Sequence, residues 1–491
     1  MSGTAGGDPL CRAADRRPDA PAADGPEAVW SYRRLDGEAS ALALRLRRRL
    51  RSSGARQRDP GPRVAAFLPR RPAGLAAVHG VPRAGAVLAP LQHGWTGREL
   101  SGYLRRLGPD LVVGPPAALE RAGEAAPETP RLELRTETGG AGDLPVEEAS
   151  GDHSLIATSG STGTPRPVRL TWENHLASAR AIAGRLDLRP EDRWYASLSL
   201  AHVGGLSLAV RAAAVGSTVV LRGDFDARTL DRLVNEERVT HASLVPVMLR
   251  RLLDLRDDRS LPESVRAVLV GGAATPSALL ERALAADVPA ALTYGLTEAC
   301  SQVATAPPEL VRRKPGTAGP PLSGVRLRLG EDDEVLVRGP TVSPGYLDGE
   351  AVTSDDGWLG TGDAGRVDGD GHLWVTGRLS ERIVTGGTTV HPAEVEEALR
   401  AHSGVREAVA LGVPSEEWGE VVGAAVVTAD DGPGREQLER HCRRRLSTPR
   451  RPRRWALLDE LPRLPNGKTD RERLRRMLQE GGDAAGADRS G

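Results

Sequence analysis

Residues 158–166 read TSGSTGTPR, and the architecture of this 491-residue chain can be worked out from this stretch. It follows a short apolar segment, SLIAT at residues 154–158, which is typical of a buried β-strand. Small residues after a strand let backbone N–H groups converge on an anion, while the hydroxyls add donors and Arg166 adds charge. The pattern predicts a phosphate-binding loop. A flexible Ser/Gly linker is the alternative, but a linker needs neither the strand nor the Pro-Arg pair. The stretch matches neither a Walker loop nor a GxGxxG fingerprint.

On both sides of this loop, apolar runs alternate with segments of helical spacing. The alternation predicts an α/β fold in which parallel sheets are covered by helices. The runs expected to be strands lie at residues 64–69, 86–91, 111–114, 217–222, 241–246 and 267–272. From about Lys314 the period changes to two, which predicts antiparallel strands of a small β-barrel. After Arg378, mixed helix and strand patterns predict a small α+β unit.

These changes in pattern divide the chain into four expected parts. We expect residues 29–378 to form a large domain and residues 379–478 to form a small domain. The flanking residues 1–28 and 479–491 are rich in Gly, Ala and Asp. This composition predicts a disordered leader and a disordered tail.

Composition excludes several classes of function. The formal net charge is zero, with 27% charged residues, which argues against a general binder of nucleic acid. No apolar run approaches the ~20 residues of a membrane-spanning helix, so no membrane insertion is expected. The three cysteines lie far apart without a CxxC pair, which indicates neither a zinc site nor a disulfide framework. We expect a cytoplasmic protein, and the sequence leaves open whether it is a homo-oligomer.

Lysine is rare in this chain. Lys314 and Lys468 are the only lysines among its 66 basic residues, and all the others are arginine. Lys468 stands in the string LPRLPNGKTD. A lysine is a compact point charge on a flexible stem and can reach into a site where the planar fork of arginine does not fit. Chance survival of Lys468 is the alternative to a catalytic role. For Lys314 we expect a surface position without a specific role.

Three further strings occur in the order typical of one superfamily. With TSGSTGTPR, the strings YGLTEACS (residues 294–301), TGDAGRVDGDGHLWVTGR (residues 361–378) and LPNGK resemble the adenylate-forming superfamily of acyl-CoA synthetases, luciferases and peptide-synthetase adenylation domains. The resemblance implies ATP and Mg²⁺ as cofactors, with Lys468, Thr297 and Glu298 as catalytic residues. It implies that Glu298 and Thr162 contact the metal. The implied nucleotide-binding residues are Thr158, Ser159, Gly160, Ser161, Thr162, Gly163, Arg166, Tyr294, Gly295, Asp363 and Arg378.

The same resemblance implies a second half-reaction with CoA as co-substrate. Members of the superfamily rotate the small domain after adenylation, which removes the catalytic lysine and admits the CoA thiol. Ser380, in GRLSER at residues 377–382, falls at the hinge position of the superfamily. A basic stretch at residues 440–455 could contact nucleic acid or the CoA phosphates, although a solvated helix and loop is the simpler interpretation.

The middle of the chain indicates which acid is activated. The strings LSLAHVGGLSLAVRAAAVGSTVVL, THASLVPVMLRRLL and VLVGGAATP most resemble the o-succinylbenzoate–CoA ligases of menaquinone biosynthesis. The resemblance implies an aromatic keto-diacid as substrate, and the implied acyl-site residues are His202, Arg211, Ser243, Gly271 and Gln302. Arg211 lies inside an apolar helical run, where a cation is costly to bury unless it meets an anion. An internal salt bridge, or a side chain that reaches solvent at the helix edge, is the alternative.

Two other functions remain open from the sequence. Another aryl-CoA or acyl-CoA ligase, or an enzyme that passes its acyl group to a carrier protein, would use the same chemistry on a different acid. A mono-acid gives no reason for a cation in the acyl pocket, so Arg211 argues against these. A non-catalytic adenylate-binding protein would be expected to lack at least one of Lys468, Glu298, Asp363 and Arg378, all of which are present.

Overall fold

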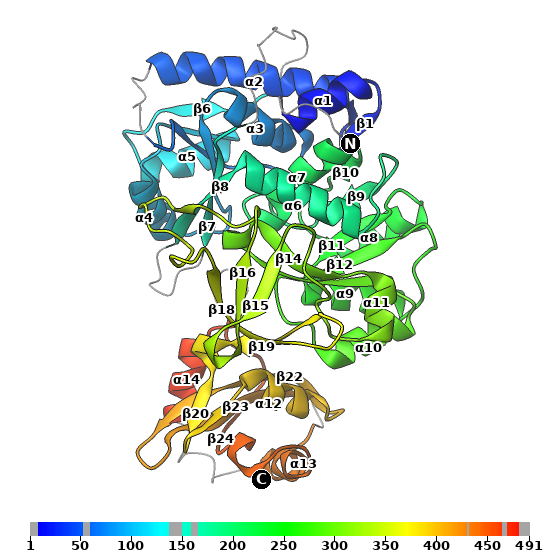
Figure 1. The fold of residues 1–491 in the computed structure, drawn as a ribbon, viewed down its shortest axis with the longest axis vertical. Helices are drawn as coiled ribbons and strands as arrows, with labels where there is room; N and C mark the ends of the chain where they lie inside the picture. Colours follow the sequence, from blue (N-terminus) through cyan, green and yellow to red (C-terminus); the bar gives the residue numbers. More distant parts are fainter. Residues whose placement is uncertain are drawn as a thin grey trace, which may run out of the picture.

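The computed structural model describes residues 8–52, 59–136, 150–158, 165–429, 432–463 and 469–480. It is elongated, with the large domain at one end and the small domain at the other (Figure 1). None of the helices in these ranges is long and apolar enough to cross a bilayer. The helices run over α1 (Pro9–Arg16), α2 (Tyr32–Ser52), α3 (Pro72–Arg83), α4 (Gly97–Leu107), α5 (Pro116–Ala125), α6 (Trp172–Arg185), α7 (Val203–Val215), α8 (Ala227–Asn235), α9 (Pro246–Arg256), α10 (Ser277–Ala285), α11 (Pro308–Arg313), α12 (Pro392–Arg400), α13 (Arg435–Arg445) and α14 (Arg471–Glu480).

Two mostly parallel sheets form the large domain, as the alternation of apolar runs predicted. The first has the order β14 (Ser301–Ala306), β13 (Ala290–Leu296), β12 (Ala267–Val270), β11 (His241–Leu244), β9 (Arg193–Tyr195), β10 (Thr218–Val220), β1 (Pro21–Asp24) and β2 (Val29–Ser31). The second has the order β17 (Gly345–Tyr346), β8 (Arg166–Thr171), β7 (Asp152–Thr158), β4 (Val87–Pro90), β3 (Arg63–Ala66), β5 (Leu111–Gly114) and β6 (Arg131–Glu133). Helices α6 and α7 pack on each other, and α6 contacts β8 of one sheet and β14 of the other. This helix pair therefore lies between the two sheets (Figure 1).

Helix α4 illustrates how the local sequence fixes these elements. Thr96 and Glu99 form a reciprocal capping box at its start, which satisfies backbone N–H groups that have no partner within the helix. Gly108 ends the helix in the left-handed conformation, with φ of 55°. Between these caps, apolar residues at helical spacing, among them Leu100 and Leu104, are buried against the second sheet.

The antiparallel unit differs in detail from the expected barrel. Its four strands, β15 (Arg326–Leu329), β16 (Glu334–Arg338), β18 (Leu359–Val367) and β19 (Leu373–Arg378), pair in that order. Strands β15 and β19 are its two ends, so the unit is a four-stranded sheet in place of a closed barrel. The register pairs Asp363 of β18 with Arg378 of β19.

The small domain begins where this sheet ends. After β19, the short helix η3 (Leu379–Glu381) leads into a five-stranded sheet of β21 (Thr388–Val390), β20 (Ile383–Thr385), β23 (Gly419–Thr428), β22 (Val405–Ser415) and β24 (Arg454–Leu458). Two hydrophobic clusters stabilise this domain, and their buried members all lie between Ile383 and Leu478. Its hydrophobic core is thus separate from those of the large domain.

The expectation of a disordered leader is wrong for the described residues of 1–28. Helix α1 and strand β1 fall within it, and β1 pairs with β10 of the first sheet. Leu10 is fully buried, while the carboxylate of Asp8 lies 2.9 Å from Nδ1 of His79 and 2.7 Å from Nε of Arg83. These contacts are made to distant parts of the sequence, so the Ala- and Asp-rich composition did not reveal them. At the other end, Gln479 and Glu480 belong to α14 and are not part of a disordered tail; residues 481–491 lie outside the described ranges.

Candidate active site

Arg211 is the most unusual residue of the predicted acyl site. It lies on α7, and only 1% of its surface is exposed. Its Nη2 donates a hydrogen bond to Oε1 of Gln302 on β14 at 3.1 Å, and its Cζ lies 5.0 Å from the ring centroid of Trp194. No carboxylate of the described residues pairs with it, and its Nε has no hydrogen-bond partner there. Neither an internal salt bridge nor a solvent-reaching side chain therefore explains this arginine.

The titratable groups around Arg211 are neutral. Burial raises the pKa of the Cys300 thiol, although the charge of Arg211 acts in the opposite direction. Burial also lowers the pKa of His175 to about 3 and that of His241 to about 4, so both imidazoles are uncharged near neutral pH. Burial lowers the pKa of Arg211 itself to about 10, which leaves it protonated. The surroundings thus hold an uncompensated positive charge, which is favourable only where an anion binds.

The other acyl-site candidates are only partly gathered around this charge. Oγ of Ser243, at β11, accepts a hydrogen bond from Nε1 of Trp194 at 2.9 Å, so Ser243 is connected to Arg211 through that indole. Gly271 follows β12, where an added Cβ would lie 2.5 Å from Cγ2 of Thr293, so a side chain there would clash with β13. His202 is exposed at the N-cap of α7, nine residues before Arg211 and about 13 Å from it along the helix axis. It lies at the opposite end of α7 from the arginine.

Three predicted nucleotide residues meet between β13, β18 and β19. The Tyr294 hydroxyl donates to Oδ2 of Asp363 at 2.7 Å, and Nε of Arg378 pairs with Oδ1 of the same carboxylate at 2.9 Å. Asp363 is 6% exposed. Burial raises the pKa of its carboxyl group above the ordinary value, and the contacts with Tyr294 and Arg378 offset only part of this effect. Gly295 next to Tyr294 is required by packing, because an added Cβ would lie 1.6 Å from the carbonyl oxygen of Ser301.

Thr297 and Glu298 lie on the short helix η1 (Thr297–Ala299), directly after β13. Both are half-buried. Oε1 of Glu298 accepts a hydrogen bond from the hydroxyl of Tyr346 at 3.2 Å. Among the described residues no cation pairs with the Glu298 carboxylate, so its charge is available to a bound metal ion. A half-buried carboxylate of this kind suits Mg²⁺, which takes oxygen ligands.

The ends of the predicted phosphate loop are described, and its centre is not. Strands β7 and β8 are antiparallel, and Thr158 pairs with Arg166 across the hairpin. The guanidinium of Arg166 lies 3.8 Å from the ring centroid of Tyr346 and pairs with Asp348 at 3.1 Å and Glu350 at 2.7 Å. Ser159, Gly160, Ser161, Thr162 and Gly163 lie outside the described residues, as does Lys468.

The predicted hinge residue Ser380 lies within η3, between the last strand of the large domain and the first strand of the small one. Next to it, Glu381 pairs with Arg471 at 3.1 Å, and Arg382 pairs with Asp332 at 3.5 Å. Ion pairs therefore connect the segment around Ser380 to Arg471 of the small domain and to Asp332 of the large domain.

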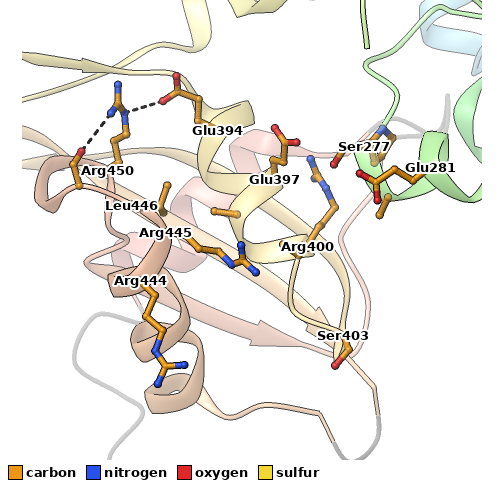
Figure 2. Close-up of a pocket in the computed structure, with 15 residues that line it drawn as sticks. Ser277, Glu281, Glu394, Glu397, Arg400, Ser403, Arg444, Arg445, Leu446 and Arg450 are labelled. Carbon is orange, nitrogen blue, oxygen red and sulfur yellow. Dashed lines mark hydrogen bonds and ion pairs between the residues drawn. The ribbon is translucent and has the colours of Figure 1, made fainter. Parts of the chain in front are cut away.

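A cleft of about 940 Å³ separates the two domains near this hinge (Figure 2). It is lined by α10 on one side and by α12 and α13 on the other, and the labelled arginines of Figure 2 come from the small domain. Arg444 and Arg445 belong to the basic stretch identified in the sequence. None of the predicted nucleotide or acyl residues lines this cleft, so it is distinct from the candidate active site.

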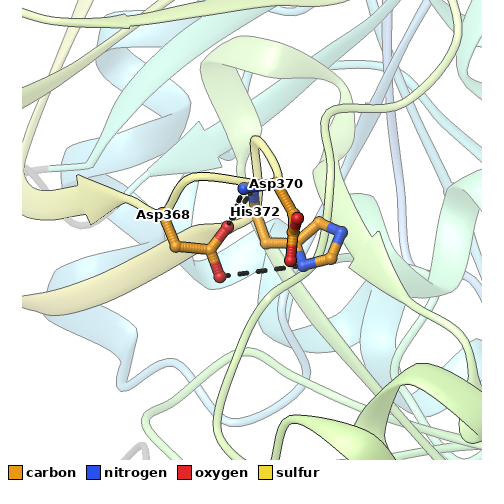
Figure 3. Close-up of side chains that lie close together, drawn as sticks. All are labelled: Asp368, Asp370 and His372. Carbon is orange, nitrogen blue, oxygen red and sulfur yellow. Dashed lines mark hydrogen bonds and ion pairs between the residues drawn. The ribbon is translucent and has the colours of Figure 1, made fainter.

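Asp368, Asp370 and His372 form the one group in the described part of the chain whose spacing could suit a metal ion (Figure 3). Nζ of Lys314 lies 2.8 Å from Oδ2 of Asp368 and also pairs with Asp370. The hydrogen bond from Lys314 holds the pKa of Asp368 well below its usual range. A cation of the chain itself therefore satisfies this turn, and Lys314, to which the sequence assigned no role, forms ion pairs there.

Sequence reasoning missed three residues of the site. Tyr346 follows a Gly in an antiparallel segment, and nothing local to it indicates a contact with Glu298. The sequence did not indicate a role for Trp194 or Cys300 in the site, because a buried Trp or Cys is usual in a hydrophobic core. The apolar strand RWY before the predicted acyl helix is the one signal that could have drawn attention to Trp194.

Known proteins resemble this chain over nearly its whole length. The profile of the AMP-binding enzyme family matches residues 10–347, and that of the AMP-binding enzyme C-terminal domain matches residues 394–468. The 2-succinylbenzoate–CoA ligase of Bacillus licheniformis is 40% identical over 347 residues, which cover 67% of this chain and 72% of the relative. The corresponding ligase of a Geobacillus species is 33% identical over 455 residues, covering 88% of this chain and 90% of the relative.

Solved structures of a Bacillus subtilis protein agree with this. The o-succinylbenzoate CoA synthetase in complex with the acyl-adenylate intermediate OSB-AMP is 30% identical, with a TM-score of 0.87 and coverage of 96% of this chain and 98% of that one. The same synthetase with ATP and a magnesium ion gives a TM-score of 0.84 at 30% identity, covering 97% and 100%. A double mutant bound to the product analogue OSB-NCoA gives 0.71, also at 30% identity, covering 97% and 99%.

Proposed function

Because this chain belongs to the AMP-binding enzyme family, we propose that it activates 2-succinylbenzoate with ATP and transfers the acyl group to CoA. The products are 2-succinylbenzoyl-CoA, AMP and pyrophosphate, and the reaction serves menaquinone biosynthesis. The relatives named above are 2-succinylbenzoate–CoA ligases, and the Bacillus subtilis structures contain the acyl-adenylate of this acid.

Arg211 is the observation that carries the choice of acid. 2-Succinylbenzoate has two carboxylates, of which the succinyl one is activated and the benzoate one remains charged throughout. A buried guanidinium without a carboxylate partner in the described chain matches that second anion in charge and in geometry. A mono-acid would leave the arginine buried and uncompensated.

In the first half-reaction a carboxylate oxygen attacks the α-phosphorus of ATP. A C–O–P linkage forms, and the bond to the β-phosphate breaks as pyrophosphate leaves. Both reactants are anions, so the enzyme must chiefly position them and neutralise charge. Asp363 and Arg378 hold the ribose, Thr297 contacts the α-phosphate, and Lys468 contributes a positive charge from the small domain.

Magnesium supplies further charge neutralisation at the phosphates when it is bound. Glu298 suits this ion because its carboxylate is half-buried and makes no ion pair with a described residue. Thr162 of the phosphate loop is the second ligand in this proposal. Arg166, at the end of the same loop, keeps its charge within reach of the phosphates while Asp348 and Glu350 hold it.

In the second half-reaction the sulfur of CoA attacks the acyl carbon. A C–S bond forms, the thiol proton is released, and the bond between the acyl carbon and the phosphate oxygen breaks as AMP leaves. The higher TM-score with the acyl-adenylate complex than with the product-analogue complex supports an adenylating arrangement of the two domains here. Rotation about Ser380 then gives the arrangement for thioester formation.

ATP–pyrophosphate exchange on the purified protein tests the proposal with 2-succinylbenzoate, benzoate, 4-phenylbutyrate and octanoate. We expect exchange with 2-succinylbenzoate alone. Exchange with a mono-acid would keep the adenylating chemistry and refute the assigned acid. Absence of exchange with every acid of the panel would refute the assignment to 2-succinylbenzoate and the role of Arg211 together.

A further inference from the structure

Tyr346 contacts the residue that the proposed function assigns to magnesium. Its hydroxyl donates to Oε1 of Glu298 at 3.2 Å, which joins β17 to η1 across 48 positions of sequence. The backbone supports the same junction, because N–H of Ser343 donates to the carbonyl oxygen of Glu298 at 2.8 Å. Glu298 is thus held from one segment at both its side chain and its main chain.

The segment that carries Tyr346 is itself fixed to the phosphate-loop hairpin. Strand β17 pairs antiparallel with β8, with Tyr346 opposite Val168. The hydroxyl of Ser343 donates to the carbonyl oxygen of Arg169 at 2.6 Å, and N–H of Leu347 donates to that of Pro167 at 2.9 Å. The position of the phenol therefore follows that of β8.

The ring of Tyr346 is also held on one face. The guanidinium of Arg166 stacks on it at 3.8 Å from the ring centroid, and the same guanidinium pairs with Asp348 and Glu350, two and four residues after the tyrosine. A cation over an aromatic face is attractive, and the ion pairs keep the cation in place. Rotation of the ring would break this arrangement.

From these contacts we propose that Tyr346 is a positioning residue for the magnesium site. Its phenol fixes one carboxylate oxygen of Glu298 and leaves the other available to the ion. The tyrosine thereby connects the metal ligand to the end of the phosphate loop at Arg166. This inference rests on the role of Glu298 in the proposed function, and nothing in it depends on which acid is activated.

The physical basis is the cost of ordering a ligand. A Glu side chain that is free to rotate loses conformational entropy when it binds a metal, whereas a carboxylate already held by a hydrogen bond loses less. Groups around a metal ligand commonly orient it, and their removal weakens metal binding by ten- to a hundredfold at the upper end. For a single neutral donor whose partner keeps its backbone support, we expect roughly three- to tenfold.

Calorimetric titration with ATP, in the absence of any acid, tests the inference. The quantity measured is the ratio of the Kd for ATP in EDTA to the Kd in saturating Mg²⁺. Tyr346→Phe removes only the hydroxyl, and we expect this ratio to fall by roughly three- to tenfold while the Kd in EDTA stays unchanged. Tyr103→Phe is the matched control, because the buried Tyr103 hydroxyl of α4 has no hydrogen-bond partner among the described residues.

A second pair of variants separates positioning from a general structural effect. Glu298→Gln should remove most of the dependence on Mg²⁺, and adding Tyr346→Phe to it should cause no further loss. An unchanged ratio in Tyr346→Phe beside a reduced ratio in Glu298→Gln would overturn this inference alone. An unchanged ratio in Glu298→Gln would refute the proposed metal ligand, and the positioning role would fall with it. Additive effects of the two substitutions would also overturn the inference.

Discussion

Replacement of Arg211 by methionine should have opposite effects on stability and on substrate binding. Burial lowers the pKa of Arg211 from its ordinary value to about 10. Each pKa unit corresponds to about 1.4 kcal/mol, so the charged form costs the folded protein about 3 kcal/mol at neutral pH. Arg211→Met removes this cost and loses the hydrogen bond to Gln302, which contributes about 1 kcal/mol. We expect the free energy of unfolding to rise by about 1–2 kcal/mol.

The pH dependence of this effect has a definite sign. The unfolded chain binds the Arg211 proton more tightly than the folded chain, so the unfavourable contribution is complete below pH 10. It disappears as the pH rises above about 10, where first the folded and then the unfolded chain loses this proton, so stability increases there. The stability gained by Arg211→Met should therefore be constant between pH 6 and 9, as measured by urea unfolding.

Catalysis should respond in the other direction. Loss of a buried, charge-assisted contact to a carboxylate costs about 2–5 kcal/mol. The KM for 2-succinylbenzoate in ATP–pyrophosphate exchange should therefore rise by about a hundredfold, since 2.7 kcal/mol is a factor of about one hundred. The KM for ATP should change little, because the nucleotide residues lie on other strands.

Arg256 provides a matched control. It is also buried, at 6% exposure, but it pairs with Asp231 and donates to the side chain of Asn235 at 3.2 Å. Arg256→Met leaves the half-buried carboxylate of Asp231 without this partner and should lower the free energy of unfolding by about 1–3 kcal/mol. If Arg211→Met destabilises the protein as much as Arg256→Met and leaves the KM for 2-succinylbenzoate unchanged, Arg211 is structural and the reasoning is refuted.

Three further predictions concern other parts of the chain. Lys468→Ala should nearly abolish adenylation and spare thioester formation from a supplied acyl-adenylate; equal loss of both half-reactions would contradict its role. Asp8→Asn should destabilise the large domain by about 1–3 kcal/mol, because the buried Arg83 and His79 lose a carboxylate partner while Arg83 keeps its ion pair with Asp36. Burial alone would raise the pKa of Asp8, but His79 and Arg83 hold it well below its usual range, so its contribution disappears as the pH falls into the acid range and the variant should show a flatter acid limb in urea titrations. Lys314→Ala should lower the midpoint of thermal unfolding only slightly, because its ion pairs with Asp368 and Asp370 are partly exposed; a large drop would indicate a role beyond this turn.

The sequence predicted the elements of the fold well where one apolar run makes one strand. Residues 64–69 overlap β3 in all but its first residue, residues 86–91 contain β4, and residues 111–114 are β5. These patterns depend on the spacing of apolar residues along the chain, which can be read directly from the sequence. The error at residues 1–28 has the opposite origin: α1 and β1 are stabilised by contacts with α7, β10 and Arg83, and composition carries no information on such partners.

The residues of the candidate site could likewise be predicted where a local string identifies them, and not where distant segments meet. Asp363, Arg378 and Tyr294 stand in recognisable strings, and the structure brings their side chains together. The neutral surroundings of Arg211 could not be predicted, because Trp194, His241 and Cys300 approach it from three separate elements. Tyr346 reaches Glu298 only because β17 pairs with β8, and this pairing joins segments more than 170 residues apart.

The separate hydrophobic cores have a thermodynamic consequence for the second half-reaction. Within the described residues, no buried cluster contains members from both sides of the hinge, so rotation of the small domain exposes no core. Such a rotation would break polar contacts between the domains, for example the ion pair of Arg382 with Asp332. An ion pair of this kind contributes about 0–1 kcal/mol. The free energies of the two orientations therefore differ little. A ligand that binds one orientation more tightly by 1–3 kcal/mol changes their population ratio by about 5- to 150-fold, which is enough to reverse such a difference.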